Sequence, residues 1–151
     1  MYWSNYKSHS CFLHRWIFKR YVKKSILKKL KNILYMIFLN SLILLAIDTF
    51  WLSFIKTHYN KVITSIQGGS PPLFRPLYAI PVYIALGYLL MFPKTKGQAF
   101  FLGLCTYAIY DFTVLTLFHK YPLNIALMDT LWGGILMFTA FYILNRFKSI
   151  L

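Results

Sequence analysis

The sequence predicts an all-α, polytopic membrane protein in which four transmembrane helices form a bundle that follows a basic N-terminal extension. Of the 151 residues, 58% are hydrophobic and only 13% are charged, whereas soluble domains carry about 25% charged residues. The apolar residues also fall into four runs, each close to the length that crosses a hydrocarbon core of about 30 Å. These observations exclude an ordinary soluble domain.

The N-terminal extension, residues 1–32, holds nine of the 17 basic residues and no acidic residue. Its apolar residues have a spacing compatible with an amphipathic helix on an anionic cytoplasmic leaflet. In that interpretation the side chains that contact lipid headgroups are Arg20, Lys23, Lys24 and Lys28. A poorly ordered basic tail is an equal alternative, and a third is that Met36 is the true start.

The four expected spans are residues 33–55, 73–92, 98–118 and 123–144. A polar linker follows the first span, and its Gly68-Gly69-Ser70-Pro71-Pro72 stretch should stop any helix. Pro81 predicts a kink in the second span, since neighbouring helices satisfy the carbonyl that a proline frees. Short basic turns join the second span to the third and the third to the fourth.

Four spans place both ends of the chain on one side of the membrane. Of the 17 bases, 13 fall on that side and four on the other. Because cytoplasmic loops are enriched in Lys and Arg, both termini are expected in the cytoplasm.

The chain contains only three acidic residues, Asp48, Asp111 and Asp129, and all of them lie inside apolar runs. An ionised carboxylate at mid-span costs about 2.5 to 3.5 kcal/mol, so this placement requires an explanation. Helix rise puts each aspartate roughly 10 Å below the outer boundary of its span. We therefore expect one polar cluster in the outer half of the bundle, a candidate proton or cation site, whose further members are Arg75, Tyr107, Tyr110 and Thr113.

The motif Asp-Thr-x-Trp occurs twice, at residues 48–51 and 129–132. Trp51 is expected to serve in helix packing or as an interfacial anchor, and Trp132 in packing. Donation of either indole N–H to a carboxylate is the alternative. Gly133 and Gly134 are expected to let a neighbouring helix approach closely.

Three patterns, taken in order, carry a resemblance to a family. They are Asp-x-x-Trp-Leu from Asp48, Tyr-Asp-x-Thr from Tyr110, and Asp-x-x-Trp-Gly from Asp129, the last after Pro122. With them the chain resembles, over about residues 33–147, the small predicted membrane proteins of bacteria grouped as domain of unknown function 2177. Val114 stands where the family pattern leads us to expect an asparagine. The resemblance implies a four-helix membrane protein of unestablished activity.

The leading functional hypothesis is a structural or partner-binding bundle with a buried polar cluster. One alternative is a small transport module that responds to protons or cations, and a second is a membrane enzyme that uses His58 or His119 on a lipid headgroup. We expect no catalytic residue, metal or cofactor. The expected partner is a bilayer with anionic headgroups on its cytoplasmic side, with a homo-oligomer left open. Nucleic acid is not expected, because the bases lie beside apolar runs.

Overall fold

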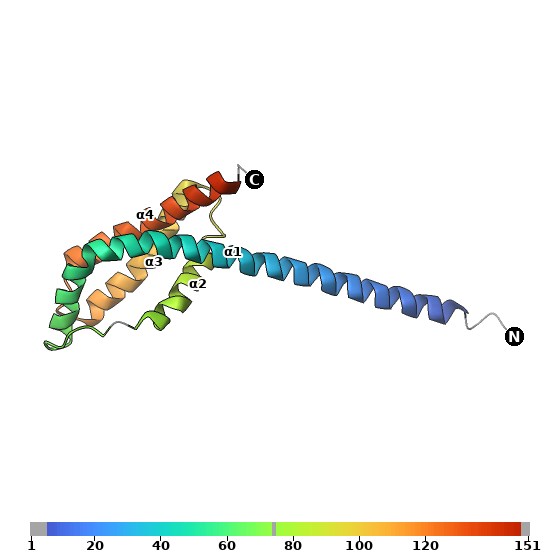
Figure 1. Cartoon of the computed structure of the whole chain (residues 1–151), viewed down its shortest axis with the longest axis horizontal. Helices are drawn as coiled ribbons and strands as arrows, with labels where there is room; N and C mark the ends of the chain where they lie inside the picture. The colour runs from blue at the N-terminus through green and yellow to red at the C-terminus, as the bar shows by residue number, and fades with distance from the viewer. Residues whose placement is uncertain (1–5, 74, 149–151) are drawn as a thin grey trace. The chain divides into compact units, whose positions relative to one another are not determined.

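A computed structural model describes residues 6–73 and 75–148, with side chains for Arg20 and for residues 22–73 and 75–147. The fold is all-α, as the sequence predicts (Figure 1). Its elements are α1 (Tyr6–Ile66), the 3₁₀ helix η1 (Pro76–Tyr78), α2 (Ala79–Leu89), α3 (Lys96–Leu117) and α4 (Leu123–Lys148). Residues 1–5 of the expected extension and residue 74 of the second expected span lie outside the described residues.

The chain divides into two units, residues 1–36 and residues 37–151. The described part of the first unit is the N-terminal portion of α1, which is helical from Tyr6. The four basic side chains that we expect at lipid headgroups are exposed there: Arg20, Lys23, Lys24 and Lys28. Their contact with lipid stays a prediction.

Three helices in the described chain are long and apolar enough to cross a membrane: Val22–Ile66, Lys96–Leu117 and Leu123–Phe147. The fourth apolar helical segment, Pro76–Leu89, is shorter. At about 2.0 Å per 3₁₀ residue and 1.5 Å per α residue it extends roughly 22 Å, less than a hydrocarbon core of about 30 Å. This helical segment is shorter than the expected span 73–92, because it begins at Pro76 and ends at Leu89, before Pro93.

α1 is longer than the first expected span and continues through residues that we expected in the linker. Residues 56–66 contain no Gly or Pro that would stop the helix. It ends at Ile66, before Gly68 and Gly69, whose φ angles are 67° and 99° and so favour glycine. The N–H of Gly69 donates to the carbonyl of Thr64 at 2.8 Å, and Lys120 Nζ donates to the carbonyl of Ser65 at 3.1 Å. Both bonds satisfy carbonyls that a helix end leaves without partners.

Pro81 lies in the first turn of α2 instead of at a kink inside a longer helix. The N–H groups of a first turn have no partner within the helix, so proline loses nothing there. The expectation of a proline kink in mid-span was wrong for this reason.

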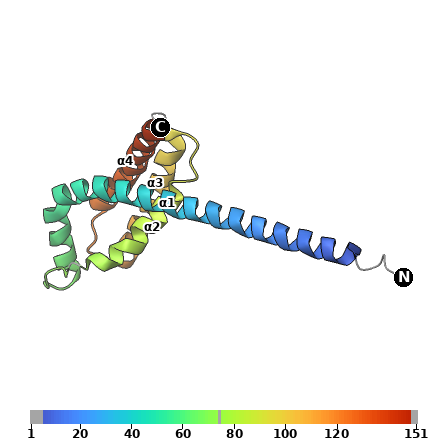
Figure 2. The ribbon, with the colours of Figure 1, turned by 45° about the vertical axis from the view of Figure 1, so that its right-hand side comes forward.

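α1 changes direction along its C-terminal part, where its green portion turns away from the cyan portion (Figures 1 and 2). Thr49 Oγ1 donates to the carbonyl of Leu45 at 2.6 Å, and Ser53 Oγ donates to the carbonyl of Thr49 at 2.7 Å. Such bonds to the preceding turn weaken the helical ladder and favour bending. The segment after them packs on Tyr121, in the connection between α3 and α4, and on the start of α4. There Tyr59, Val62 and Ile66 contact Tyr121, Ile125 and Ala126.

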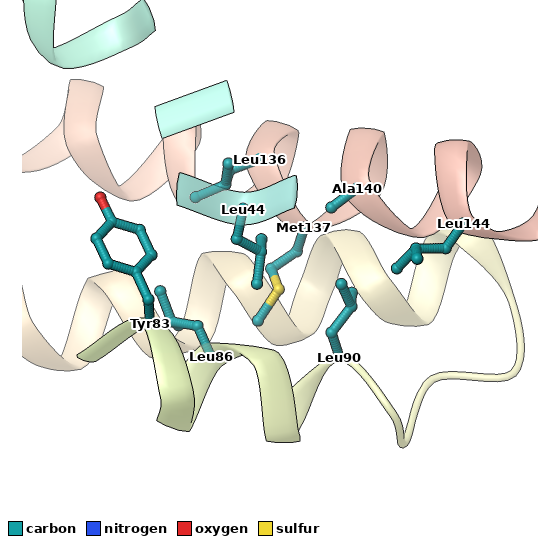
Figure 3. Close-up of a cluster of buried hydrophobic side chains, with 8 residues drawn as sticks. All are labelled: Leu44, Tyr83, Leu86, Leu90, Leu136, Met137, Ala140 and Leu144. Atoms are coloured by element: carbon teal, nitrogen blue, oxygen red, sulfur yellow. The ribbon is translucent and has the colours of Figure 1, made fainter. Parts of the chain in front are cut away.

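α4 is the central helix of the second unit. In the most apolar 18 residues of α4, 44% of the residues are buried, against 17% for the corresponding stretch of α1 and 11% for that of α3. Leu44 of α1 and Leu86 of α2 pack against Leu136 and Met137 of α4 (Figure 3). In the other direction along α1, Tyr59 reaches Asp129 near the start of α4. As residue numbers rise along α1, the residues of α4 in contact with it fall in number, so the two helices are antiparallel.

Glycines allow the closest helix contacts. A Cβ on Gly103 of α3 would collide with the backbone of Gly133 on α4, so the two helices touch there. On α2, a Cβ on Gly87 would collide with Ser41 of α1. Ser41 Oγ donates to the carbonyl of Tyr83, and Asn40 Nδ2 donates to the carbonyl of Gly87, each at 2.9 Å.

The α3–α4 contact predicts a position-specific cost. Gly103→Ala should destabilise the protein by about 1 to 3 kcal/mol, because the added methyl meets a backbone that cannot rotate away. Gly97→Ala is the matched control, since the nearest atom to its added Cβ is Thr95 Oγ1 at 4.0 Å. Thermal unfolding in detergent, followed by circular dichroism, measures both. Equal unfolding temperatures for the two variants would contradict the contact.

Candidate functional site

The two Asp-Thr-x-Trp motifs meet and exchange partners. Trp132 Nε1 of α4 donates to Asp48 Oδ1 of α1 at 2.8 Å, and Trp51 Nε1 of α1 donates to Asp129 Oδ1 of α4 at 3.3 Å. The two indole rings stack, with centroids 4.5 Å apart and planes 9° from parallel. Each tryptophan therefore binds the aspartate of the other motif, which the antiparallel arrangement of the two helices permits.

Two tyrosine hydroxyls donate to the remaining oxygens of these carboxylates. Tyr83 of α2 donates its hydroxyl to Asp48 Oδ2 at 2.7 Å, and Tyr59 of α1 donates to Asp129 Oδ2 at 2.6 Å. The Tyr83 hydroxyl points away from Leu86 and Leu90, so the ring belongs to the apolar core and the oxygen to the polar site (Figure 3). Both oxygens of both carboxylates thus accept a hydrogen bond.

Asp111 of α3 is fully buried and has its own two donors. Tyr121, in the connection between α3 and α4, donates to Oδ1 at 2.9 Å, and Thr130 donates to Oδ2 at 3.4 Å. Burial and the bond to Asp111 raise the pKa of the Tyr121 hydroxyl above its ordinary value, so it keeps its proton and donates. Thr130 follows Asp129 directly, and Tyr121 packs against Tyr59. These contacts place Asp111 beside the paired motifs.

We call these three carboxylates and their donors the aspartate cluster. All three aspartates are less than a tenth exposed. Six neutral groups donate to them, one to each oxygen: Trp51, Tyr59, Tyr83, Tyr121, Thr130 and Trp132. Each of the six bonds joins two different structural elements, so the cluster links all four helices.

Among the described residues, the other side chains expected in the cluster form no hydrogen bond with the three aspartates. Tyr107 is half-buried, and its ring lies against Gly133. Tyr110 is 60% exposed, and the Thr113 hydroxyl donates to the carbonyl of Ile109 in its own helix. Arg75 is exposed, and within residues 6–73 and 75–148 it forms no ion pair with an aspartate. Gly134 accommodates the ring of Phe100.

Sequence reasoning did not single out Tyr59 or Tyr121. Tyr59 follows Asp48 by 11 residues, close to three helical turns, so it shares the face of Trp51 and Ile55. This signal requires α1 to continue past residue 55, which the structure shows. Tyr121 lies outside the helices, where no periodicity applies.

A family model described as "Predicted membrane protein (DUF2177)" matches residues 32–143, most of the chain. The chain belongs to this family. The matched range holds the three aspartates and all six of their donors, and it leaves residues 1–31 of the N-terminal extension outside. No curated protein and no solved structure matches the chain.

The exchanged pairs predict energetic coupling between Asp48 and Trp132 and between Asp129 and Trp51. Trp132→Phe removes the donor to Asp48 and should cost about 1 to 2 kcal/mol of unfolding free energy. In a double-mutant cycle with Asp48→Asn, a coupling of about 1 kcal/mol is expected. Unfolding in mixed micelles measures each variant.

Tyr142→Phe serves as the control in this cycle. Its ring lies under Lys96 at 4.5 Å from the Nζ atom, ten residues beyond Trp132 on α4. Its effect should add to that of Asp48→Asn without coupling. A coupling with Trp132 no larger than that with Tyr142 would contradict the observed pair.

Proposed function

We propose that this family member is a multi-pass membrane protein that binds a partner without catalysing a reaction. In this proposal the aspartate cluster fixes the four helices in the arrangement that binds. The observation that carries the proposal is that every carboxylate oxygen accepts a hydrogen bond from another element. A saturated network of this kind rigidifies a bundle.

The histidines of the enzyme alternative do not join this network. His58 and His119 are both exposed, and within the described residues neither forms a hydrogen bond with a carboxylate. A general acid or base needs to reach its substrate at hydrogen-bonding distance, and the cluster presents the aspartates to other helices instead. This favours binding over catalysis.

We further propose that both termini are cytoplasmic and that the first unit lies against anionic headgroups. Its exposed Lys23, Lys24 and Lys28 support the second part, since each base near such a surface contributes about 1 kcal/mol. The excess of bases on the side of the termini supports the first part.

A second candidate function is a module that responds to protons or cations. The observation that favours it is that all six donors to the three aspartates are neutral groups. Charges gathered in a low-dielectric region without a compensating base are costly, and a bound proton or cation lowers that cost. Tyr107 lies at the margin of the cluster without a hydrogen-bond partner among the described residues, and its hydroxyl is available to such a ligand.

Unfolding of Asp129 variants tests the structural role of the cluster, and ion flux separates the two candidate functions. Asp129→Asn keeps an acceptor for Trp51 and should cost about 1 kcal/mol, whereas Asp129→Leu leaves Trp51 and Tyr59 unpaired and should cost about 2 to 4 kcal/mol. Unfolding in detergent measures this order. Liposomes containing the parent protein should show no proton or cation flux above that of protein-free liposomes.

If the parent liposomes conduct protons or a monovalent cation, and folded Asp129→Asn abolishes the flux, the structural role is insufficient. The second candidate would then replace the first.

A further inference from the structure

An apolar groove of about 1050 Å³ lies between α1 and the η1–α2 segment. Eight of its lining side chains are large and aliphatic: Leu42, Leu45, Leu52, Ile55, Ile63, Leu73, Ile80 and Ile84. The exposed fractions of four of these residues, Leu45, Leu52, Ile80 and Ile84, lie between 41% and 54%. The groove therefore offers a largely apolar surface on which an acyl chain could lie.

The rim of the groove suits contact with hydrocarbon. Pro72 and Pro76 line it, and neither has a backbone N–H that would need a hydrogen-bond partner. An irregular segment at membrane depth is costly mainly through unsatisfied backbone groups, and proline removes one at each position.

Two tyrosines of the aspartate cluster form part of the wall. Tyr59 and Tyr83 line the groove, while their hydroxyls donate to Asp129 and Asp48. The positions of these two rings, and hence the shape of the groove, depend on the cluster.

The lining of the groove includes two basic residues. Lys56 and Arg75 line it, and a neighbouring polar pocket of about 940 Å³ is lined by Lys56, Lys61 and Lys120. Lys56 and Asn60 line both cavities, so the apolar groove and the polar pocket adjoin at these two residues. Two positive charges thus line the apolar groove, and two more line the pocket that adjoins it.

In the described part of the chain, none of the three aspartates pairs with these bases. The chain's only acidic residues are these aspartates, and both oxygens of each are occupied in the cluster. Across the described ranges, no ion pair involves Lys56, Lys61, Arg75 or Lys120. An anion from outside the chain would therefore complement these positive charges.

We propose that the groove binds a phospholipid with a net negative headgroup, with one acyl chain between α1 and α2 and the phosphate at Lys56 and Arg75. Lys61 and Lys120 lie in the adjoining pocket and attract the remainder of the headgroup. The assignment rests on the proposed binding function and names its partner. A soluble anion would leave the apolar groove empty, and an uncharged lipid would leave the four bases without a counter-charge.

The test uses the full-length protein in phosphatidylcholine nanodiscs that contain a small fraction of lipid spin-labelled on its acyl chain. The label is placed on phosphatidylglycerol in one series and on phosphatidylcholine in the other. Electron paramagnetic resonance measures the immobilised fraction. The parent should immobilise labelled phosphatidylglycerol in clear preference to labelled phosphatidylcholine.

Two variants examine the two halves of the site. Lys56→Gln with Arg75→Gln should lower the preference for phosphatidylglycerol by about tenfold, since both bases contribute near the headgroup. Leu45→Trp fills the groove without a change in charge and should reduce immobilisation of both lipids. Lys94→Gln with Lys96→Gln is the matched control, because it removes two charges from residues that line neither cavity, and it should retain the parent's preference.

Three results would overturn the proposal: equal immobilisation of the two lipids by the parent, an unchanged preference in Lys56→Gln with Arg75→Gln, or an unchanged immobilised fraction in Leu45→Trp. Loss of the immobilised fraction as the protein self-associates would assign the groove to a second copy and overturn it as well. Unfolding free energies are measured on the same samples. Failure of the lipid preference while the Asp48–Trp132 coupling persists would remove the lipid assignment alone and leave the proposed function standing.

Discussion

A carboxylate inside a membrane bundle must find hydrogen-bond donors on neighbouring helices, and this requirement organises the second unit. An isolated charge in hydrocarbon costs several kcal/mol, so each of the three aspartates is stable only where other elements supply donors. The indole N–H groups of Trp51 and Trp132 donate to aspartates across the α1–α4 contact. Tyrosine hydroxyls from α1, α2 and the α3–α4 connection donate to the three aspartates as well. Helices that slid or rotated against one another would lose several bonds together.

The same requirement connects the cluster to features at some distance from it. Tyr59 reaches Asp129 because α1 continues to Ile66 and its C-terminal part packs against the α3–α4 connection. Tyr83 reaches Asp48 because Ser41 and Asn40 of α1 bind backbone carbonyls of α2 beside Gly87. The rings of these two tyrosines also face the apolar groove. The polar cluster thereby sets the separation of α1 from α2, on which the shape of the groove depends.

Much of this arrangement follows from simple features of the sequence, and the remainder depends on tertiary contacts. Apolar runs in the sequence predict the helices, and the position of all three acidic residues inside those runs predicts a shared polar site. The repeat at residues 48–51 and 129–132 is visible in the sequence, but the exchange of partners requires knowing that α1 and α4 are antiparallel and in contact. The end of α1 was underestimated because polar residues 56–66 look like a linker, although nothing in them stops a helix. Tyr121 joins Asp111 from a connection, where helical spacing has no predictive value.

The exchanged pairing of Asp48 with Trp132 and of Asp129 with Trp51 is the central claim, and the indole N–H resonances of the protein labelled with ¹⁵N-tryptophan test it most directly. Asp129→Asn should shift the Trp51 indole resonance and speed its exchange with water more than it affects Trp132. Asp48→Asn should do the reverse, with its main effect on Trp132. If each aspartate instead affected chiefly the tryptophan three residues after it in its own helix, the exchange of partners between α1 and α4 would be contradicted.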